Sequence, residues 1–265
     1  MQIPLPTLLL ALCAAVWPSC RPAASHDTVA APAVEASEPA FEPAPAFSQL
    51  IVVTTAGWNS ISGTLLTYAW KENAWQQALG PIPIVVGKNG MAWGRGLEDF
   101  RSRTGPVKKE GDLRSPAGIF RLGTAFGYAS ASDAAWVKLD YTPVEKTTMC
   151  IEDIASAHYN RIVDERATLS DWNSTDHMLR KDDLYEWGVF VAHNAEDPAP
   201  GGGSCIFLHV WSKNGSGTAG CTAMEKEQIK RLLAWIDPAA APAIVQAPQS
   251  EYAALRDSYL LPKLP

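Results

Sequence analysis

The sequence predicts a mostly β fold with a few short helices, and the distribution of apolar residues is the main reason. Short runs rich in β-branched and aromatic side chains recur along the chain, and Gly, Asn and Pro separate them. These runs span residues 50–55, 64–70, 82–86, 119–122, 187–192 and 206–211. One amphipathic helix is expected after residue 222, where apolar residues have i, i+3, i+4, i+7 spacing at Ile229, Leu232, Leu233 and Ile236.

Composition restricts the class of protein. A chain of 265 residues with 47% hydrophobic residues can bury a substantial core. Its formal net charge is −6, and its Lys and Arg residues form no basic stripe. Both features argue against a nucleic acid as a partner.

The first 47 residues are not expected to belong to the core. Residues 8–16 form an apolar run too short to span a bilayer, so residues 1–20 are predicted to be an export signal. Cys20 follows a small residue and precedes a Pro/Ala-rich tract, as in a lipoprotein; lipidation of Cys20 and export without lipid both stay open. Residues 21–47 are mostly Ala, Pro, Ser and Glu, a composition typical of a disordered linker.

The folded domain is predicted to span residues 48–265. After the first three strands, a polar segment leads to a turn at residues 115–118, where Ser115 faces the substrate, and the strand 119–122 follows. Short helices are expected within residues 133–139 and 167–180. A last strand is expected at 244–246, ahead of a packed or frayed terminus.

The segment from residue 204 to residue 224 carries the candidate chemistry. His209 lies in the predicted strand 206–211, and a loop rich in Gly and Ser leads to Cys221. Thr222 and Glu225 have capping-box spacing, which predicts that a helix begins directly after Cys221. A helix N-terminus and an imidazole both favour a thiolate, so we expect a lowered pKa for Cys221, His209 as its base and an oxyanion hole near Gly220. The alternative is a structural Cys in a turn and a buried core His.

This segment resembles the YkuD-type L,D-transpeptidase domain, whose signature is a His, a spacer and then Ser/Thr-His-Gly-Cys. His209, Thr218, Gly220 and Cys221 match it, whereas Ala219 and Ala223 depart from it, and the His-to-Cys spacing is short. Residues 110–120 are similar to the family's Thr-Pro-x-Gly-x-Phe segment. The resemblance covers about residues 48–249 and implies an L,D-transpeptidase-like β-sandwich or barrel.

The resemblance implies acyl transfer on peptidoglycan stem peptides in a bacterial periplasm or cell envelope, through a Cys221 thioester. Thr218, Trp211, His193 and Ser115 are then candidates for substrate contacts. His193 is a weaker candidate for the base, because a hairpin would put it about 13 Å from His209; a strand-end His capped by Asn194 is the alternative. A cysteine carboxypeptidase or hydrolase and a catalytically silent peptidoglycan-binding module are the other functions considered.

Cysteine arithmetic predicts one disulfide. Of five cysteines, Cys13 leaves with the signal and Cys20 is lost or lipidated. Export would permit a disulfide among the remaining three, Cys150, Cys205 and Cys221. If Cys221 stays free as the nucleophile, Cys150 and Cys205 form the pair. The acids and histidines between residues 141 and 183 have no metal-site spacing, so no metal and no organic cofactor are expected.

Overall fold

The computed structural model describes residues 45–265, so the predicted export signal, Cys20 and the linker up to residue 44 lie outside the described residues. Phe47, which the sequence assigned to the linker, is buried in the core. The strands are β1 Gln49–Thr55, β2 Ser62–Lys71, β3 Ala74–Gln77, β4 Ile82–Val85, β5 Met91–Trp93, β6 Ser115–Gly127, β7 Tyr141–Pro143, β8 Thr148–Ile151, β9 Ile162–Asp164, β10 Thr175–His177, β11 Trp187–Val191, β12 Phe207–Val210, β13 Thr222–Met224 and β14 Ala243–Pro248. The helices are α1 Lys226–Trp235 and α2 Gln249–Tyr259, with 3-10 turns at Phe100–Ser102 and Pro238–Ala240.

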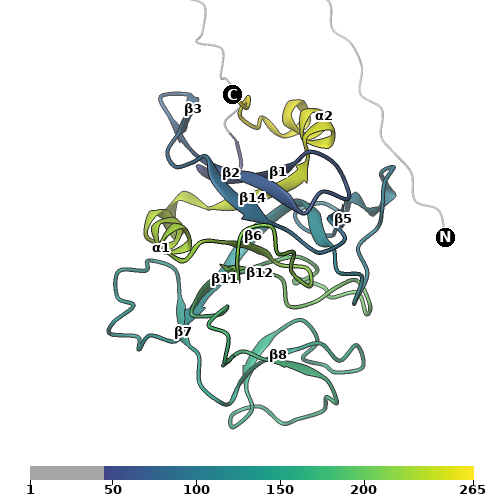
Figure 1. Ribbon diagram of the computed structural model, residues 1–265, viewed down its shortest axis with the longest axis vertical. Coiled ribbons are helices and arrows are strands. Elements are labelled where there is room, and N and C mark those ends of the chain that lie inside the picture. The colour runs from purple at the N-terminus through teal and green to yellow at the C-terminus, as the bar shows by residue number, and fades with distance from the viewer. Residues whose placement is uncertain (1–44) are drawn as a thin grey trace, which may run out of the picture. The chain divides into compact units, whose positions relative to one another are not determined.

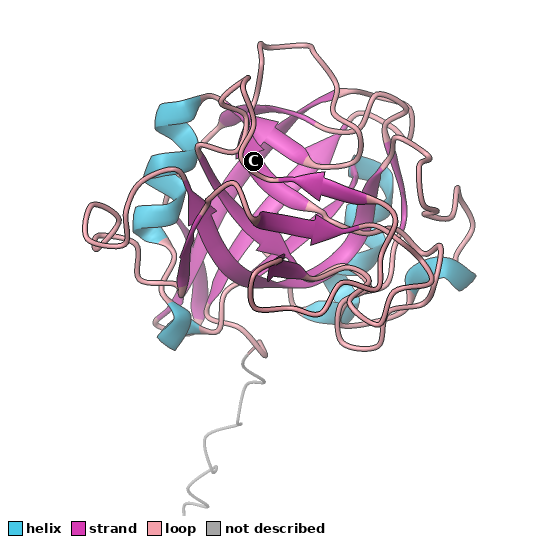
Figure 2. Ribbon diagram, turned by 90° about the horizontal axis from the view of Figure 1, so that it is seen from below, coloured by secondary structure: helices cyan, strands magenta, loops and turns pink. Residues whose placement is uncertain are grey.

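Eight strands form a closed barrel, which confirms the mostly β prediction (Figures 1 and 2). They pair in the order β1, β14, β6, β11, β12, β13, β4 and β2, and β2 pairs back onto β1. The pairs β1–β14 and β12–β13 are parallel, whereas the other barrel pairs are antiparallel. The helices lie outside the barrel, α1 against β11 and β12 and α2 against β14 and β1 (Figure 2).

A second, smaller sheet packs beside the barrel and has its own core. Its strands pair in the order β10, β8, β9. The smaller core joins this sheet to one face of β12, and it contains Cys150, Tyr185, Cys205, Phe207 and Cys221. A Cys150–Cys205 disulfide, as predicted, connects β8 to the chain entering β12. The candidate nucleophile therefore lies where the two sheets meet.

The structure has no helix at residues 133–139 or 167–180, so both predictions of a helix in the middle of the chain are wrong. Residues 131–136 form consecutive turns, although the Ser130 hydroxyl accepts from the backbone N–H of Asp133 as at a helix N-terminus. Within 167–180, the Asp171 carboxylate accepts from Ala157 N, and residues 175–177 pair with β8. Contacts distant in sequence thus override the local preference of this segment.

Three boundaries also differ from the prediction. Residues 115–118 begin the long strand β6 and pair with β5, so they form no turn. Helix α1 begins at Lys226 and is capped by the Glu225 carboxylate, because Thr222 lies in β13. The C-terminal residues include α2, which the sequence analysis missed. Among residues 45–265, no helix is long and apolar enough to cross a membrane.

Candidate active site

Strand β12 delivers His209 to the junction of the two sheets. Side chains alternate along a strand, so Leu208 and Val210 enter the barrel core, whereas Phe207 and His209 face the other side. The His209 ring packs edge-on against Tyr185, with ring centroids 5.2 Å apart. Its Nδ1 lies 2.7 Å from the Val210 carbonyl oxygen. Because a carbonyl only accepts, Nδ1 carries the proton and Nε2 is left as the basic nitrogen.

Cys221 lies immediately before β13, the parallel neighbour of β12. Its Sγ accepts from the Phe207 N–H at 3.3 Å and donates to the Cys205 carbonyl at 3.6 Å, so the thiol is held against the start of β12. Gly220 precedes it with φ +157°, a conformation that favours glycine. A Cβ at residue 220 would lie 3.3 Å from the Arg114 carbonyl oxygen, so a side chain there would crowd the nucleophile loop.

Two hydroxyls fix the backbone of Cys221. The Ser115 Oγ and the Thr218 Oγ1 donate to the Cys221 carbonyl at 2.8 and 2.5 Å. Ser115 is fully buried and also accepts from Gly87 N, so it supports the nucleophile and does not face the substrate as predicted. The Gly220 N–H donates to Thr218 Oγ1 at 3.1 Å, so this amide is already hydrogen-bonded within the loop.

Burial sets the protonation of both reactive groups. Desolvation raises the pKa of Cys221 to about 12, and the nearby Asp176 charge adds to this effect. Desolvation lowers the pKa of His209 to about 4. The predicted lowering of the Cys221 pKa is therefore wrong, because β13 separates the thiol from the start of α1 and burial prevails. The resting pair is a neutral thiol and a neutral imidazole.

Two pockets meet at Cys221. The first, of about 130 Å³, is lined by His209, Trp211, Thr218 and Arg180 as well as Cys221. The second has the same volume, about 130 Å³, and includes Lys108, Glu110, Glu152 and Asp176 with Cys221. Tyr185, Ala219 and Cys221 line both, so these three residues form the boundary between the pockets. The exposed Ala219 puts only a methyl group at this boundary.

A family model, described as the L,D-transpeptidase catalytic domain (YkuD), matches residues 61–245, well over half of the chain. The chain belongs to this family. Searches among curated proteins and among solved structures found no match. The YkuD family acts on peptidoglycan peptides.

Two of the four predicted substrate residues of this YkuD domain lie apart from the pockets. Trp211 and Thr218 share a pocket with Cys221 and His209, but neither Ser115 nor His193 lines a pocket at Cys221. The His193 Nδ1 accepts from Arg95 N at 3.3 Å and its Nε2 donates to the Gly202 carbonyl at 3.0 Å. His193 is thus a buried connector of two loops, and burial lowers its pKa to about 4.

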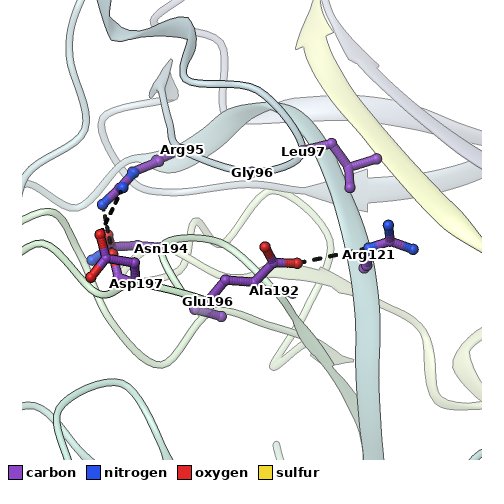
Figure 3. Close-up of a pocket in the computed structure, with 9 residues that line it drawn as sticks. Arg95, Gly96, Leu97, Arg121, Ala192, Asn194, Glu196 and Asp197 are labelled. Carbon is purple, nitrogen blue, oxygen red and sulfur yellow. Dashed lines mark hydrogen bonds and ion pairs between the residues drawn. The ribbon is translucent and has the colours of Figure 1, made fainter. Parts of the chain in front are cut away.

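Another surface pocket of the YkuD domain contains neither Cys221 nor His209 (Figure 3). Its charged groups already pair with each other, Arg95 with Asp197 at 3.2 Å and Arg121 with Glu196 at 3.8 Å. No nucleophile lines it, so it is a poor candidate for acyl transfer.

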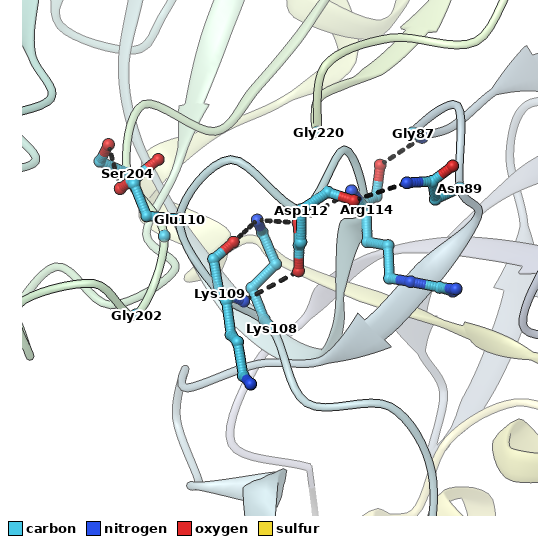
Figure 4. Close-up of polar contacts among 12 residues, drawn as sticks. Gly87, Asn89, Lys108, Lys109, Glu110, Asp112, Arg114, Gly202, Ser204 and Gly220 are labelled. Atoms are coloured by element: carbon cyan, nitrogen blue, oxygen red, sulfur yellow. Dashed lines mark hydrogen bonds and ion pairs between the residues drawn. The ribbon is translucent and has the colours of Figure 1, made fainter.

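Sequence reasoning missed the groups that surround Cys221 in the second pocket. Tyr185 donates to the Asp176 carboxylate at 2.6 Å, and Asp176 lies between residues 141 and 183, where the sequence predicted no site. Lys108 is buried and pairs with Asp112 at 2.6 Å (Figure 4). The sequence feature that includes Asp176 is a group of acids with no regular spacing. Such a pattern does not predict which side chains lie beside the Cys221 thiol.

Proposed function

We propose that the protein catalyses cysteine-dependent acyl transfer on peptidoglycan stem peptides, with Cys221 as nucleophile and His209 as base. The observation that carries this proposal is that the two side chains line one pocket at the junction of the sheets, each held by its own backbone contacts. Family membership supports the reaction class. Export and residence in the bacterial envelope, with or without lipid on Cys20, belong to the same proposal.

The neutral resting pair implies that the thiol loses its proton during attack and not before. The Cys221 sulfur attacks a peptide carbonyl carbon of the stem while its proton passes to His209 Nε2. Collapse of the tetrahedral intermediate breaks the C–N bond, and His209 returns the proton to the leaving amine. A thioester on Cys221 remains, and an amine from a second stem resolves it as a new amide.

Support around the nucleophile explains how Ala219 is compatible with this chemistry. The Ser115 and Thr218 hydroxyls hold the Cys221 carbonyl, so the loop is fixed without the imidazole that the family signature has before Gly220. The small Ala219 side chain lines both pockets and adds little bulk at their boundary. A donor peptide bound in the pocket that contains His209 would present its carbonyl to the sulfur.

Intact-mass measurement after exposure to a carbapenem or to a tetrapeptide donor tests the proposal. A covalent adduct is expected on the wild type and on Asn214→Ala, a change on the exposed part of the same loop, and none on Cys221→Ala. An adduct that survives loss of Cys221 would falsify the assignment. No adduct on any variant, with binding to cell-wall sacculi retained, would favour the silent binding module.

Resolution by water in place of an amine would make the same site a carboxypeptidase. Adding an amine acceptor during turnover of the tetrapeptide distinguishes the two: transfer product is expected at the expense of hydrolysis product. If the ratio of transfer product to hydrolysis product does not change when the amine is added, the hydrolase is favoured.

A further inference from the structure

The second pocket at Cys221 has no role in the acylation step described above. Its walls come from the small sheet, from the 108–113 segment and from the chain that leads into β12. His209 lines only the pocket on the other side of Cys221. A transfer reaction needs a second substrate to reach the thioester, and this pocket gives an approach to the sulfur that the donor side does not occupy.

Among the carboxylates of this pocket, Glu152 differs from the others. Glu110 accepts from the Tyr159 and Ser204 hydroxyls at 2.5 and 2.8 Å (Figure 4). Asp176 accepts from Tyr185 and lies 3.6 Å from an Arg180 nitrogen. Within the described residues, Glu152 has neither a hydrogen bond nor an ion pair, and its carboxylate is partly buried. It is the acid in the pocket that is free to bind an incoming group.

A disulfide and a hydrogen bond connect the segment that carries Glu152 to the nucleophile. Glu152 directly follows β8 and lies two residues after Cys150, which is bonded to Cys205. The Cys205 carbonyl accepts from the Cys221 thiol, and the Cys205 N–H donates to the Asn160 side chain at 2.9 Å. The disulfide thus connects the end of β8 to the residue that holds the sulfur.

We propose that Glu152 is a catalytic residue for the second half-reaction: it binds the ammonium group of the acceptor in this pocket and takes its proton before attack on the thioester. This inference rests on the proposed function. It assigns the donor and the acceptor to opposite sides of Cys221, and it makes the protein a transferase that selects a cationic amine over water.

The electrostatics of the pocket are consistent with this role. Burial, together with the charges of Asp176 and Glu110, raises the pKa of Glu152 to about 7. The other groups facing this pocket are Tyr185, the Cys221 thiol and Lys108, which pairs with Asp112. An acid with a pKa near neutrality exchanges protons with an amine efficiently. The Glu110 and Asp176 carboxylates, in contrast, already accept hydrogen bonds from hydroxyl groups of the protein.

The step balances in protons and electrons. The acceptor ammonium gives one proton to the Glu152 carboxylate, and the freed lone pair forms a C–N bond to the thioester carbonyl carbon. The C–S bond then breaks, its electron pair returns to sulfur, and the second nitrogen proton restores the Cys221 thiol. Glu152 releases its proton to solvent, and the third nitrogen proton stays on the new amide.

The test separates acylation from transfer. Wild type, Glu152→Gln and the control Glu165→Gln, which alters an exposed acid directly after strand β9 of the small sheet, are acylated with the tetrapeptide donor and then mixed with glycinamide at pH 7. Acylation, followed by intact mass, is expected in all three, and Glu152→Gln should acylate no more slowly than wild type, because the Glu152 charge is one of those that raise the Cys221 pKa. Transfer to glycinamide is expected to fall by about 10²-fold in Glu152→Gln only.

Further readouts separate catalysis from a structural role. The transfer rate of the wild type should rise with pH through an ionisation near 7 that is absent in Glu152→Gln, and Glu152→Asp should restore part of the transfer. Equal transfer rates and equal pH profiles in wild type and Glu152→Gln would overturn the inference while leaving Cys221 acylation intact. A loss of acylation in Glu152→Gln would also overturn it, because the residue would then act on the nucleophile. Failure of the wild type to acylate would instead refute the proposed function.

Discussion

Removing the Cys150–Cys205 disulfide should lower the free energy of unfolding by about 4 kcal/mol. The two cysteines are 55 residues apart. In the chain-entropy model, closing a loop of that length lowers the conformational entropy of the unfolded chain, which raises its free energy by about 4 kcal/mol at 25 °C. Both cysteines are buried in the core that joins the two sheets. The loss should therefore act on the small sheet and on the start of β12 together.

Urea unfolding of Cys221→Ser and of the triple variant that also has Cys150→Ala and Cys205→Ala measures this difference. The Cys221→Ser background prevents thiol exchange and keeps the disulfide, so it is the matched control. With a urea dependence of about 2 kcal/mol per M, the midpoint should fall by roughly 2 M. A fall of less than about 0.5 M would refute the reasoning, because the loop would then be restricted in the unfolded chain by other means.

Four more predictions concern protonation, catalysis and location. Because burial lowers the pKa of His209 to about 4, acylation by the wild type should lose rate only below about pH 5, and an acid limb near pH 6.5 would contradict this. His209→Gln should keep the fold and slow acylation by about 10²- to 10⁴-fold, measured by intact mass with time. The folded-state pKa of Glu152 is raised from 4.5 to about 7, so the wild type loses stability as pH rises through that window. Because this carboxylate is partly exposed, solvent screening reduces the effect of the full shift to about 2 kcal/mol; Glu152→Gln should be more stable than wild type by that amount at pH 8 and equal to it at pH 4 in urea unfolding. If Cys20 carries lipid, Cys20→Ala should move the protein from the membrane fraction to the soluble envelope fraction, and unchanged fractionation would exclude a lipid anchor at this residue.

Local patterns predicted the barrel strands well because each strand has a strong periodic or apolar signal. The runs at 50–55, 187–192 and 206–211 became β1, β11 and β12, since a β-branched segment bounded by turn residues has few alternatives. The prediction of secondary structure failed between residues 141 and 183 for the opposite reason. Its strands are three or four residues long and are held by side-chain hydrogen bonds and a disulfide, which a propensity argument does not include.

The sequence by itself determined the candidate pair, Cys221 and His209, because the motif and the strand pattern are both local. It also predicted the disulfide partners, because the predicted export signal and the need for a free nucleophile left one pairing. The protonation of the pair was decided only by the tertiary structure: burial at the junction of two sheets outweighs a helix N-terminus that β13 keeps at a distance. Glu152 and Asp176 line the pocket at Cys221 because the small sheet and its disulfide bring them there. More than 40 residues of chain separate each of them from Cys221, so no local motif could predict this proximity.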